Sequence, residues 1–470
     1  AIIIGGSLAG LFAARVLADH YDEVVIIDRD EMPEIPRHRS GVPQSQHAHG
    51  LLARGQQIIE GHFPGIMASL VEQGAIQGDV DTVCIVTPAG KLASKPTGEE
   101  GVFVSRYLLE WTVRERLKQI PGVTLIEQTA VTRLLTNTDQ SQVIGVETRP
   151  RKGKRPTEMR LADLVVDASG RRSRTPQWLV DLGYEAAPEE QINSGVGYLS
   201  RFYERPANFP ADWEGLIVNA RPPHNPRAGL ILSIENDQWH VTLGNFAGHY
   251  PDTAQVTTDE GFLEYAATLS DPSLYEAIRV ARPLTPVRAY RTPTNYLRHY
   301  EQLTRLPGHF IITGDAVCAF NPIYGQGMTT SAMDSVVLAE ALRDHGPGWE
   351  RRFQHQLAKT VSTPWFIATS EDLRWAGVRL TGTSIPPGTR LLRQYINALL
   401  RAARHDEVVA EAYTRLLNLL EQPSSLLRPS IVARVAAYNL RPRRTRADQG
   451  DAWALSPSMI TMLRDRPTFN

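Results

Sequence analysis

The sequence predicts an α/β fold in which a nucleotide-binding domain is interrupted by a mostly antiparallel β-sheet domain and followed by helices. Three observations support this prediction. A strand, a glycine turn and a helix open the chain at residues 2–17. A second strand, turn and helix follow much later, at residues 310–343. Between them, residues 190–290 alternate apolar and polar positions in short runs, as antiparallel strands do.

Composition indicates a globular protein and excludes several functions. The chain has 470 residues, 42% hydrophobic and 21% charged, with a formal net charge of −1. This balance argues against binding to nucleic acid or to a membrane surface. The two cysteines, Cys84 and Cys318, indicate neither a disulfide framework nor a metal site. No apolar run approaches the ~18 residues of a membrane span and no signal peptide is visible, so we expect a cytoplasmic protein.

The opening segment has the parts of a dinucleotide-binding turn. Gly5 permits a tight turn after the first strand, and Gly10 permits close contact between that strand and the following helix. A second strand ends at Asp28, whose carboxylate can accept from a ribose hydroxyl. Ser7 replaces the usual middle glycine, and its hydroxyl is a further possible donor to a phosphate at the helix N-terminus. The alternative is a nucleotide-free domain that only needs a tight turn.

The second strand, turn and helix bring another carboxylate. An apolar strand at residues 310–312 ends at Gly314 and Asp315, and turn residues fill the crossover up to Gly327. Apolar residues then recur at helical spacing over residues 328–343. Asp315 can hold a polyol, and the helix N-terminus presents N–H groups to an electron-rich ring. The alternative is an ordinary joint between a strand and a helix.

The remaining elements follow in order. Ser105 is placed to cap a helix that runs to Lys118, with Arg106 in its first turn. A cation there opposes the helix dipole, so we expect an anion nearby. Other helices are predicted at 53–63, 65–74, 259–269, 273–280, 347–370 and 391–420. Strands are predicted at 82–86, 123–127, 131–135, 143–148, 161–167, 195–202, 216–219, 230–234 and 239–246, with turns at 137–140, 152–155 and 236–237. We expect the C-terminal helices to pack on the first domain.

Together these segments resemble the class A flavoprotein monooxygenases, which have the p-hydroxybenzoate hydroxylase fold. The resemblance covers residues 1–345. The segments that carry it are GGSLAG with Asp28-Arg29, Arg106 at the start of a helix, the loop from Asp167 to Arg171, and Gly314-Asp315 through Pro322 to Gly325-Gln326-Gly327-Met328. Residues 39–49 resemble the bacterial natural-product branch, which includes the polyether olefin epoxidases of lasalocid and monensin type. Squalene epoxidase looks like a more distant relative.

The resemblance implies a division of the chain and a cofactor. An FAD-binding domain of the p-hydroxybenzoate hydroxylase and glutathione reductase type would comprise residues 1–80, 102–188 and 284–345. Residues 81–101 and 189–283 would form the β-sheet substrate domain, and residues 346–470 a C-terminal helical region. The residues implied to bind FAD are Gly5, Ser7, Leu8, Ala9, Gly10, Asp28, Arg29, Arg39, Val42, Arg106, Val131, Asp315, Pro322, Gly325, Gly327 and Met328. NAD(P)H is implied as a transient reductant, or electrons arrive through a separate flavin reductase.

The resemblance also implies a reaction. Reduced FAD would react with O2 to give a flavin hydroperoxide, which passes one oxygen to an apolar small molecule as an epoxide or a hydroxyl. No acid–base pair is compelled, and Pro322, which lacks an N–H, would shape the oxygen-facing side. The substrate-pocket candidates are His49, Tyr198, Phe320, Asn321 and Tyr324, and further aromatic candidates on the sheet are Phe202, Tyr203, Trp239 and Phe246. Cys318 stands where many aromatic hydroxylases have His, which favours an olefinic substrate.

Other functions stay open at this point. An FAD-dependent reductase that saturates isoprenoid double bonds shares the framework, and a non-enzymatic flavin-binding carrier is the third possibility. A product heavier by one oxygen atom separates the first two. A halogenase is disfavoured because the WxWxIP signature is absent. The arginines at 171, 172 and 174 are either a site for an NADPH phosphate or a solvated turn.

Overall fold

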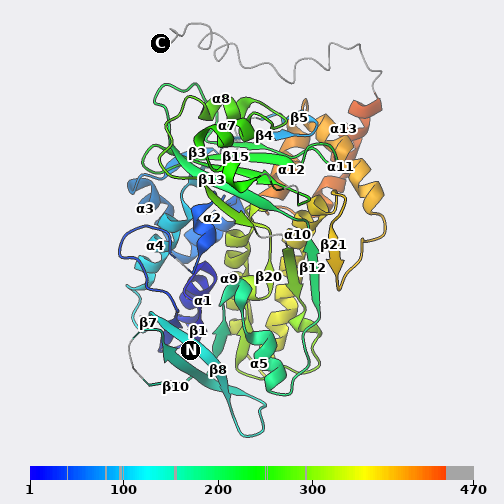
Figure 1. The fold of residues 1–470 in the computed structure, drawn as a ribbon. Helices are drawn as coiled ribbons and strands as arrows, with labels where there is room; N and C mark the ends of the chain where they lie inside the picture. The colour runs from blue at the N-terminus through cyan, green and yellow to red at the C-terminus, as the bar shows by residue number, and fades with distance from the viewer. Residues whose placement is uncertain are drawn as a thin grey trace.

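The computed structural model describes residues 1–39, 41–79, 82–94, 98, 100–152, 156–248, 250, 252–291 and 294–440. Most of the turn predicted at 152–155, and residues 441–470 of the predicted C-terminal region, lie outside the described residues. A parallel sheet with α1 and α9 occupies the lower part of Figure 1, and a larger, mostly antiparallel sheet lies above it. None of the helices described combines the length and apolar character that crossing a bilayer requires.

A five-stranded parallel sheet brings the two predicted turns to the same edge. Its strand order is β19-β11-β1-β2-β7, and every pairing is parallel. The strands are β1 (Ile2–Ile4), β2 (Val24–Ile27), β7 (Val123–Ile126), β11 (Val165–Asp167) and β19 (Phe310–Ile312). Because β11 lies between β1 and β19, the turns after β1 and β19 flank the turn after β11. This is the edge where open α/β sheets bind their ligands.

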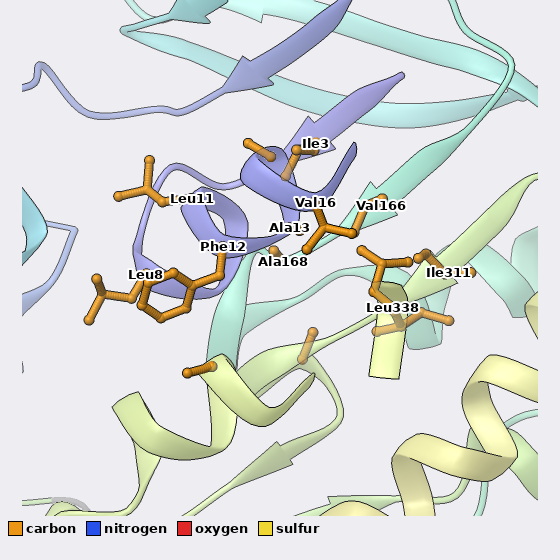
Figure 2. Close-up of a cluster of buried hydrophobic side chains, with 14 of the residues drawn as sticks. Ile3, Leu8, Leu11, Phe12, Ala13, Val16, Val166, Ala168, Ile311 and Leu338 are labelled. Atoms are coloured by element: carbon orange, nitrogen blue, oxygen red, sulfur yellow. The ribbon is translucent and has the colours of Figure 1, made fainter. Parts of the chain in front are cut away.

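The two helices that follow these turns pack together over the sheet. They are α1 (Leu8–Leu17) and α9 (Gly327–Arg343). Figure 2 shows Val16 of α1 gathered with Val166, Ile311 and Leu338, which come from β11, β19 and α9. The turns themselves also touch, since a Cβ added at Gly314 would lie 2.7 Å from the Cβ of Ala9. The predicted meeting of the two segments is therefore confirmed.

The second sheet has seven strands in the order β17-β13-β16-β15-β14-β4-β5. Its strands are β4 (Val83–Thr87), β5 (Gly90–Lys91), β13 (Gly197–Glu204), β14 (Gly215–Val218), β15 (Arg227–Ile234), β16 (Gln238–Asn245) and β17 (Arg288–Arg291). All pairings are antiparallel except that of β14 with β4. Asn236 and Asp237 close the β15–β16 hairpin with positive φ values of 63° and 51°, which Asn and Asp tolerate. The mostly antiparallel sheet is confirmed.

Smaller elements connect and cover the two sheets. The remaining strands are β3 (Ile76–Asp79), β6 (Glu100–Phe103), β8 (Thr129–Thr136), β9 (Val143–Pro150), β10 (Glu158–Leu161), β12 (Glu189–Asn193), β18 (Thr294–Arg298), β20 (Cys318–Ala319) and β21 (Arg379–Thr381). Helices before the C-terminal part are α2 (Ala53–His62), α3 (Ile66–Glu72), α4 (Arg106–Leu117), α5 (Thr175–Asp181), α6 (Thr253–Val256), α7 (Asp259–Ala266) and α8 (Ser273–Ile278). The single strand predicted at 161–167 is wrong, because the chain leaves β10 beside β9 and enters the parallel sheet as β11.

The C-terminal helices pack in two places. They are α10 (Trp349–Asp372), α11 (Thr389–Ala403), α12 (Glu407–Leu417) and α13 (Pro429–Leu440). α10 packs on α9 and β19, as predicted. In contrast, α11 to α13 lie beside the seven-stranded sheet (orange in Figure 1), where Leu399 and Leu400 join a buried cluster with Ile85 and Leu92. The prediction that all these helices pack on the first domain is wrong, because the apolar face of α11 meets β4 and its neighbourhood.

Candidate active site

A cavity of about 550 Å³ opens at the carboxyl edge of the parallel sheet. The turn after β1, the loop after β11 and the crossover between β19 and α9 all line it. Of the residues predicted to bind FAD, all except Gly10 line this cavity, as do His49, Phe320 and Asn321 of the predicted substrate set. Residues far apart in the sequence are thus brought together around one space.

The glycine turn needs glycine for two steric reasons. Gly5 has φ +106°, and a Cβ there would lie 2.5 Å from the carbonyl oxygen of Ala168. A Cβ at Gly10 would lie 1.9 Å from the carbonyl oxygen of Gly5. Gly10 therefore acts from behind the cavity wall, by letting α1 approach β1 closely. Both observations agree with the packing roles predicted for these glycines.

The start of α1 offers free N–H groups to the cavity. Leu8 and Ala9 line the cavity, and the first N–H groups of a helix have no acceptor within the helix. The side chain of Ser7 does not cap the helix. Its hydroxyl donates to Oε2 of Glu110 at 3.0 Å and accepts from Nη2 of Arg106 at 2.8 Å. Ser7 could therefore donate to a phosphate only if its hydroxyl gave up the hydrogen bond to Glu110.

A buried charge network lies behind the turn, and Glu110 is at its centre. Glu110 accepts from Nε of Arg39 at 2.9 Å and pairs with Nη1 of Arg106 at 3.1 Å. Burial raises the pKa of Glu110, but Arg106 and Arg39 outweigh this effect and lower it below the ordinary value. The anion expected near Arg106, in the first turn of α4, is therefore Glu110. The sequence carried a signal for it, the i, i+4 spacing on one helix.

Arg39 is held by carboxylates rather than left free for a phosphate. Besides Glu110, its Nη1 lies 2.8 Å from Oδ2 of Asp30 and 3.4 Å from Oδ1 of Asp28. Asp28 in turn accepts from the backbone N of Gly6 at 2.7 Å. Arg39 therefore ties the loop after β2 to the glycine turn, while Asp28 keeps its place at the end of β2.

Asp315 and Arg171 also line the cavity, and their opposite charges attract each other. Burial raises the pKa of Asp315, and the guanidinium groups of Arg171 and Arg106 partly offset this. Arg171 donates to the carbonyl of Thr294 at 2.7 Å and to that of Phe320 at 2.8 Å. Arg171 thus joins the loop after β11 to the crossover, and the alternative of a solvated turn does not apply to it. Arg172 and Arg174 also line the cavity.

A second cavity, of about 280 Å³, lies between the seven-stranded sheet and the C-terminal helices. Tyr198 and Tyr324 of the predicted substrate set line it. His49, Pro322 and Gly325 line both cavities, so the two spaces meet at the crossover loop. The walls are mainly apolar. Leu230, Leu232 and Phe246 contribute from the sheet side, Ile367, Leu400 and Leu417 from the helices, and Trp375 from the turn after α10.

The pleat of the sheet separates the aromatic candidates. Tyr198 and Phe246 line the second cavity. Tyr203 and Trp239 instead pack in a buried cluster with Phe262 of α7, on the other face of the sheet. These two residues belong to the core, because side chains alternate between faces along a strand. Phe202 stacks on His240, with ring centroids 4.0 Å apart. The sequence does not predict the helix wall, because the prediction packs the C-terminal helices on the first domain.

Two histidines beneath the second cavity are held neutral. The Nδ1 of His47 lies 2.8 Å from the hydroxyl of Ser200, and Nε2 of His240 lies 3.1 Å from the carbonyl of Gln46. Burial lowers the pKa of His47 to about 3 and that of His240 to about 4. Neither imidazole is therefore suited to proton transfer near neutral pH.

We expect these histidines to make the fold sensitive to acid. Below pH ~6.5 the unfolded chain binds protons that the folded chain excludes until about pH 4, so the free energy of unfolding falls as pH falls through that window. Denaturant unfolding at pH ~7 and pH ~5 measures the slope, and His47→Gln should reduce it. An unchanged slope in that variant would contradict the assignment of a neutral imidazole.

The fold is the FAD-binding α/β fold of flavoproteins of the p-hydroxybenzoate hydroxylase type. A family model described as "FAD binding domain" matches residues 1–356. The chain therefore belongs to the FAD binding domain family. It is an FAD-dependent oxidoreductase whose relatives include flavin monooxygenases.

Curated proteins similar in sequence include the following three. Protein Rv3254 of Mycobacterium tuberculosis is 32% identical over 454 residues, which cover 94% of each chain. A kynurenine 3-monooxygenase of Salinispora tropica is 25% identical, covering 87% of this chain and 92% of that protein. Squalene epoxidase ERG1 of Candida albicans is 27% identical, covering 53% of this chain and 47% of that protein.

Among solved structures, a triple mutant of the flavin-dependent brominase Bmp2 is similar in fold, with a TM-score of 0.62. The match covers 93% of this chain and 98% of that chain at 14% identity, so it concerns the fold alone.

The residues of the first cavity fit FAD. Gly5 keeps the turn tight and Gly10 lets α1 approach β1, and together they bring the start of α1 to the cavity wall. Seven arginines line the cavity against two aspartates, which suits an anionic pyrophosphate. At the start of α9, a Cβ on Gly327 would meet nothing within 4 Å, so the backbone there is open to a ring. Asp28 and Asp315 supply carboxylates for ribose and ribityl hydroxyls.

Proposed function

We propose that this protein is an FAD-dependent monooxygenase that inserts one oxygen atom from O2 into an apolar, olefinic natural product. The observation that carries the proposal is the meeting of a charged cavity with an apolar one at His49, Pro322 and Gly325. A flavin held in the first cavity would reach a substrate in the second only at this junction. The resemblance of residues 39–49 to polyether olefin epoxidases, and the likeness to squalene epoxidase, support epoxidation.

Each cofactor residue has a proposed role. The N–H groups at the start of α1 and the guanidinium of Arg106 would hold the pyrophosphate, and Asp28 a ribose. Val131 would contact the adenine through its backbone, and Asp315 would hold the ribityl chain. The bound flavin supplies the redox chemistry, by accepting electrons and activating oxygen. The N–H groups of Gly327 and Met328 would stabilise negative charge on the ring, because they open α9.

On the substrate side, the walls exclude water and the polar groups orient the ligand. Tyr198 has a buried hydroxyl without a hydrogen-bond partner in the described residues, so it is the group most suited to bind a polar end of the substrate. Pro322 would shape the oxygen-facing side. The lowered pKa values of His47 and His240 make both imidazoles weak bases, which favours a substrate such as an olefin that reacts without losing a proton. NAD(P)H is proposed as a transient reductant, or a flavin reductase in its place.

The test uses the purified protein. Its absorption spectrum before and after addition of FAD shows whether the flavin binds, and titration with NADH and NADPH under nitrogen identifies the reductant. Linear isoprenoid and polyketide olefins are then supplied with O2, and products are analysed by mass spectrometry. We expect bound FAD, oxygen consumption that depends on the olefin, and a product one oxygen heavier. A colourless protein that takes up no FAD, or a product with a saturated double bond, would overturn the proposal.

A further inference from the structure

The last residue of α10 lies beside the junction of the two cavities. Asp372 is fully buried, and its neighbours Glu371, Arg374 and Trp375 line the apolar cavity. The family model ends at residue 356, so this part of the chain lies beyond the family match. The end of α10 therefore belongs to the site in space, although it follows the matched region in sequence.

Uncharged donors surround the carboxylate of Asp372. Asn295 of β18 and Asn321 both donate to its Oδ2, the latter at 2.8 Å, and the hydroxyl of Tyr324 donates to Oδ1. Asn321 is also held through its backbone N, which donates to Oδ1 of Asn295 at 2.5 Å, and through Nδ2, which lies 3.0 Å from the hydroxyl of Ser194. The carboxylate thus joins β18, the crossover loop and α10.

This network forms hydrogen bonds with the crossover loop on both sides of Pro322. Asn321 lines the first cavity, which is proposed to hold the flavin. Tyr324 lines the second, apolar cavity, and Pro322 lines both. The two residues that Asp372 holds are therefore those that set where Pro322 stands between the spaces. Asp372 is thus the one residue of α10 that bonds to the described loop on both sides of Pro322, while Asn295 and Ser194 hold Asn321 as well.

The acid is kept at a cost to stability. The negative end of the α10 dipole disfavours a carboxylate at this position. Burial raises the pKa of Asp372 to about 6, although hydrogen bonds from Tyr324, Ser194, Asn295 and Asn321 lower it. Asparagine has the same shape and avoids the charge penalty, but its single amide oxygen can accept from Asn295 and Asn321 only if the Tyr324 hydroxyl turns to accept from the amide N–H.

We propose that Asp372 is a positioning residue for the flavin. It holds the segment from Asn321 to Tyr324, so that the helices forming one wall of the substrate cavity also set the place of Pro322 against the cofactor. The proposal rests on the proposed function, because it takes the first cavity to hold FAD. It assigns to the C-terminal helices a part in the active site as well as in the fold.

The test compares Asp372→Asn with Glu350→Gln in the full chain. Glu350 is a buried acid at the other end of α10; its Oε1 accepts from the backbone N of His309 at 2.7 Å, and it lines neither cavity. The readouts are the unfolding midpoint, the Kd for FAD, the midpoint potential of the bound flavin, and quenching of flavin fluorescence by iodide. These readouts need no identified substrate.

We expect Asp372→Asn to unfold at a midpoint close to that of the unmodified protein, because the charge penalty that it removes offsets the acceptor that it loses, while its Kd for FAD rises roughly tenfold and its flavin potential and quenching change. Glu350→Gln should leave the flavin readouts unchanged. Tyr324→Phe, which removes one donor and keeps the carboxylate, should reproduce part of the flavin shift and add nothing to Asp372→Asn. If Asp372→Asn does not fold, Tyr324→Phe decides alone.

Two results would overturn the inference. One is a variant at position 372 or 324 whose flavin readouts equal those of the unmodified protein. The other is an equal shift in Glu350→Gln, which would mean that any buried change in α10 disturbs the flavin. Failure of the proposed function looks different, because the unmodified protein would then bind no FAD or consume no O2.

Discussion

Gly10→Ala should lower the free energy of unfolding by about 3 kcal/mol and reduce FAD binding at least roughly tenfold. The added methyl group would lie 1.9 Å from the carbonyl oxygen of Gly5. That oxygen is backbone in a turn already held at φ +106°, so it has no easy way to move. Either α1 shifts away from β1 or the turn distorts, and both changes displace the N–H groups at the start of α1. Denaturant unfolding and fluorescence titration with FAD measure the two effects.

Gly61→Ala is the matched control for this change. Gly61 lies in α2, and a Cβ there would meet nothing within 4 Å. Alanine is a better helix former than glycine, so this variant should be more stable by about 0.5–1 kcal/mol and bind FAD normally. If both variants bind FAD equally well, the close approach of α1 to β1 does not shape the cofactor site.

Glu110→Gln should destabilise the protein stripped of flavin by about 3 kcal/mol or more. The carboxylate of Glu110 joins Arg39 and Arg106, and all three side chains are more than nine-tenths buried. Glutamine keeps the shape but removes the charge and turns an amide donor toward guanidinium donors. Two buried cations then lose their shared counter-ion. Denaturant unfolding at neutral pH measures the loss.

The stabilisation from Glu110 should also depend on pH. Because Arg106 and Arg39 lower the pKa of Glu110 against the effect of burial, its stabilisation is present above the pKa of the unfolded glutamate, about 4.3, and is lost as pH falls through the lower folded value. Glu115→Gln on the same helix is the control. Glu115 is partly exposed, pairs with Lys118 at 2.7 Å and lies 3.8 Å from Nε of Arg114, so its loss should change stability by less than about 1 kcal/mol. Equal losses in the two variants would contradict a special role for Glu110.

Much of the first cavity could be predicted from the sequence, because the patterns that indicate it are local. Gly5, Gly10 and Asp28 lie within one strand, turn, helix and strand, and each spacing has its own steric or hydrogen-bonding reason. Ser105 was predicted as a helix cap, and in the structure its hydroxyl accepts from the backbone N of Leu108. Asp315 needed one further step, the pairing of two distant turns, which the parallel strand order confirms.

The substrate side was much less readable. Period-2 patterning predicted the strands of the large sheet, but it did not say which face lines the second cavity. Tyr198 and Tyr203 have the same aromatic character, yet one lines the cavity and the other lies in the core. The wall built by α10 to α12 could not be predicted, because an amphipathic helix does not specify the surface on which its apolar face is buried.

The amino-acid sequence by itself determined the two turns, the cap of α4 and the alternation of the large sheet, because each depends on neighbours a few residues away. Only the tertiary structure decided that Glu110 would be the counter-ion of two arginines, that Arg171 would join the β11 loop to the crossover, and that Asp372 would hold the loop around Pro322. These are contacts between side chains distant in the chain. They exist only once packing has brought their elements together, and no local pattern records them.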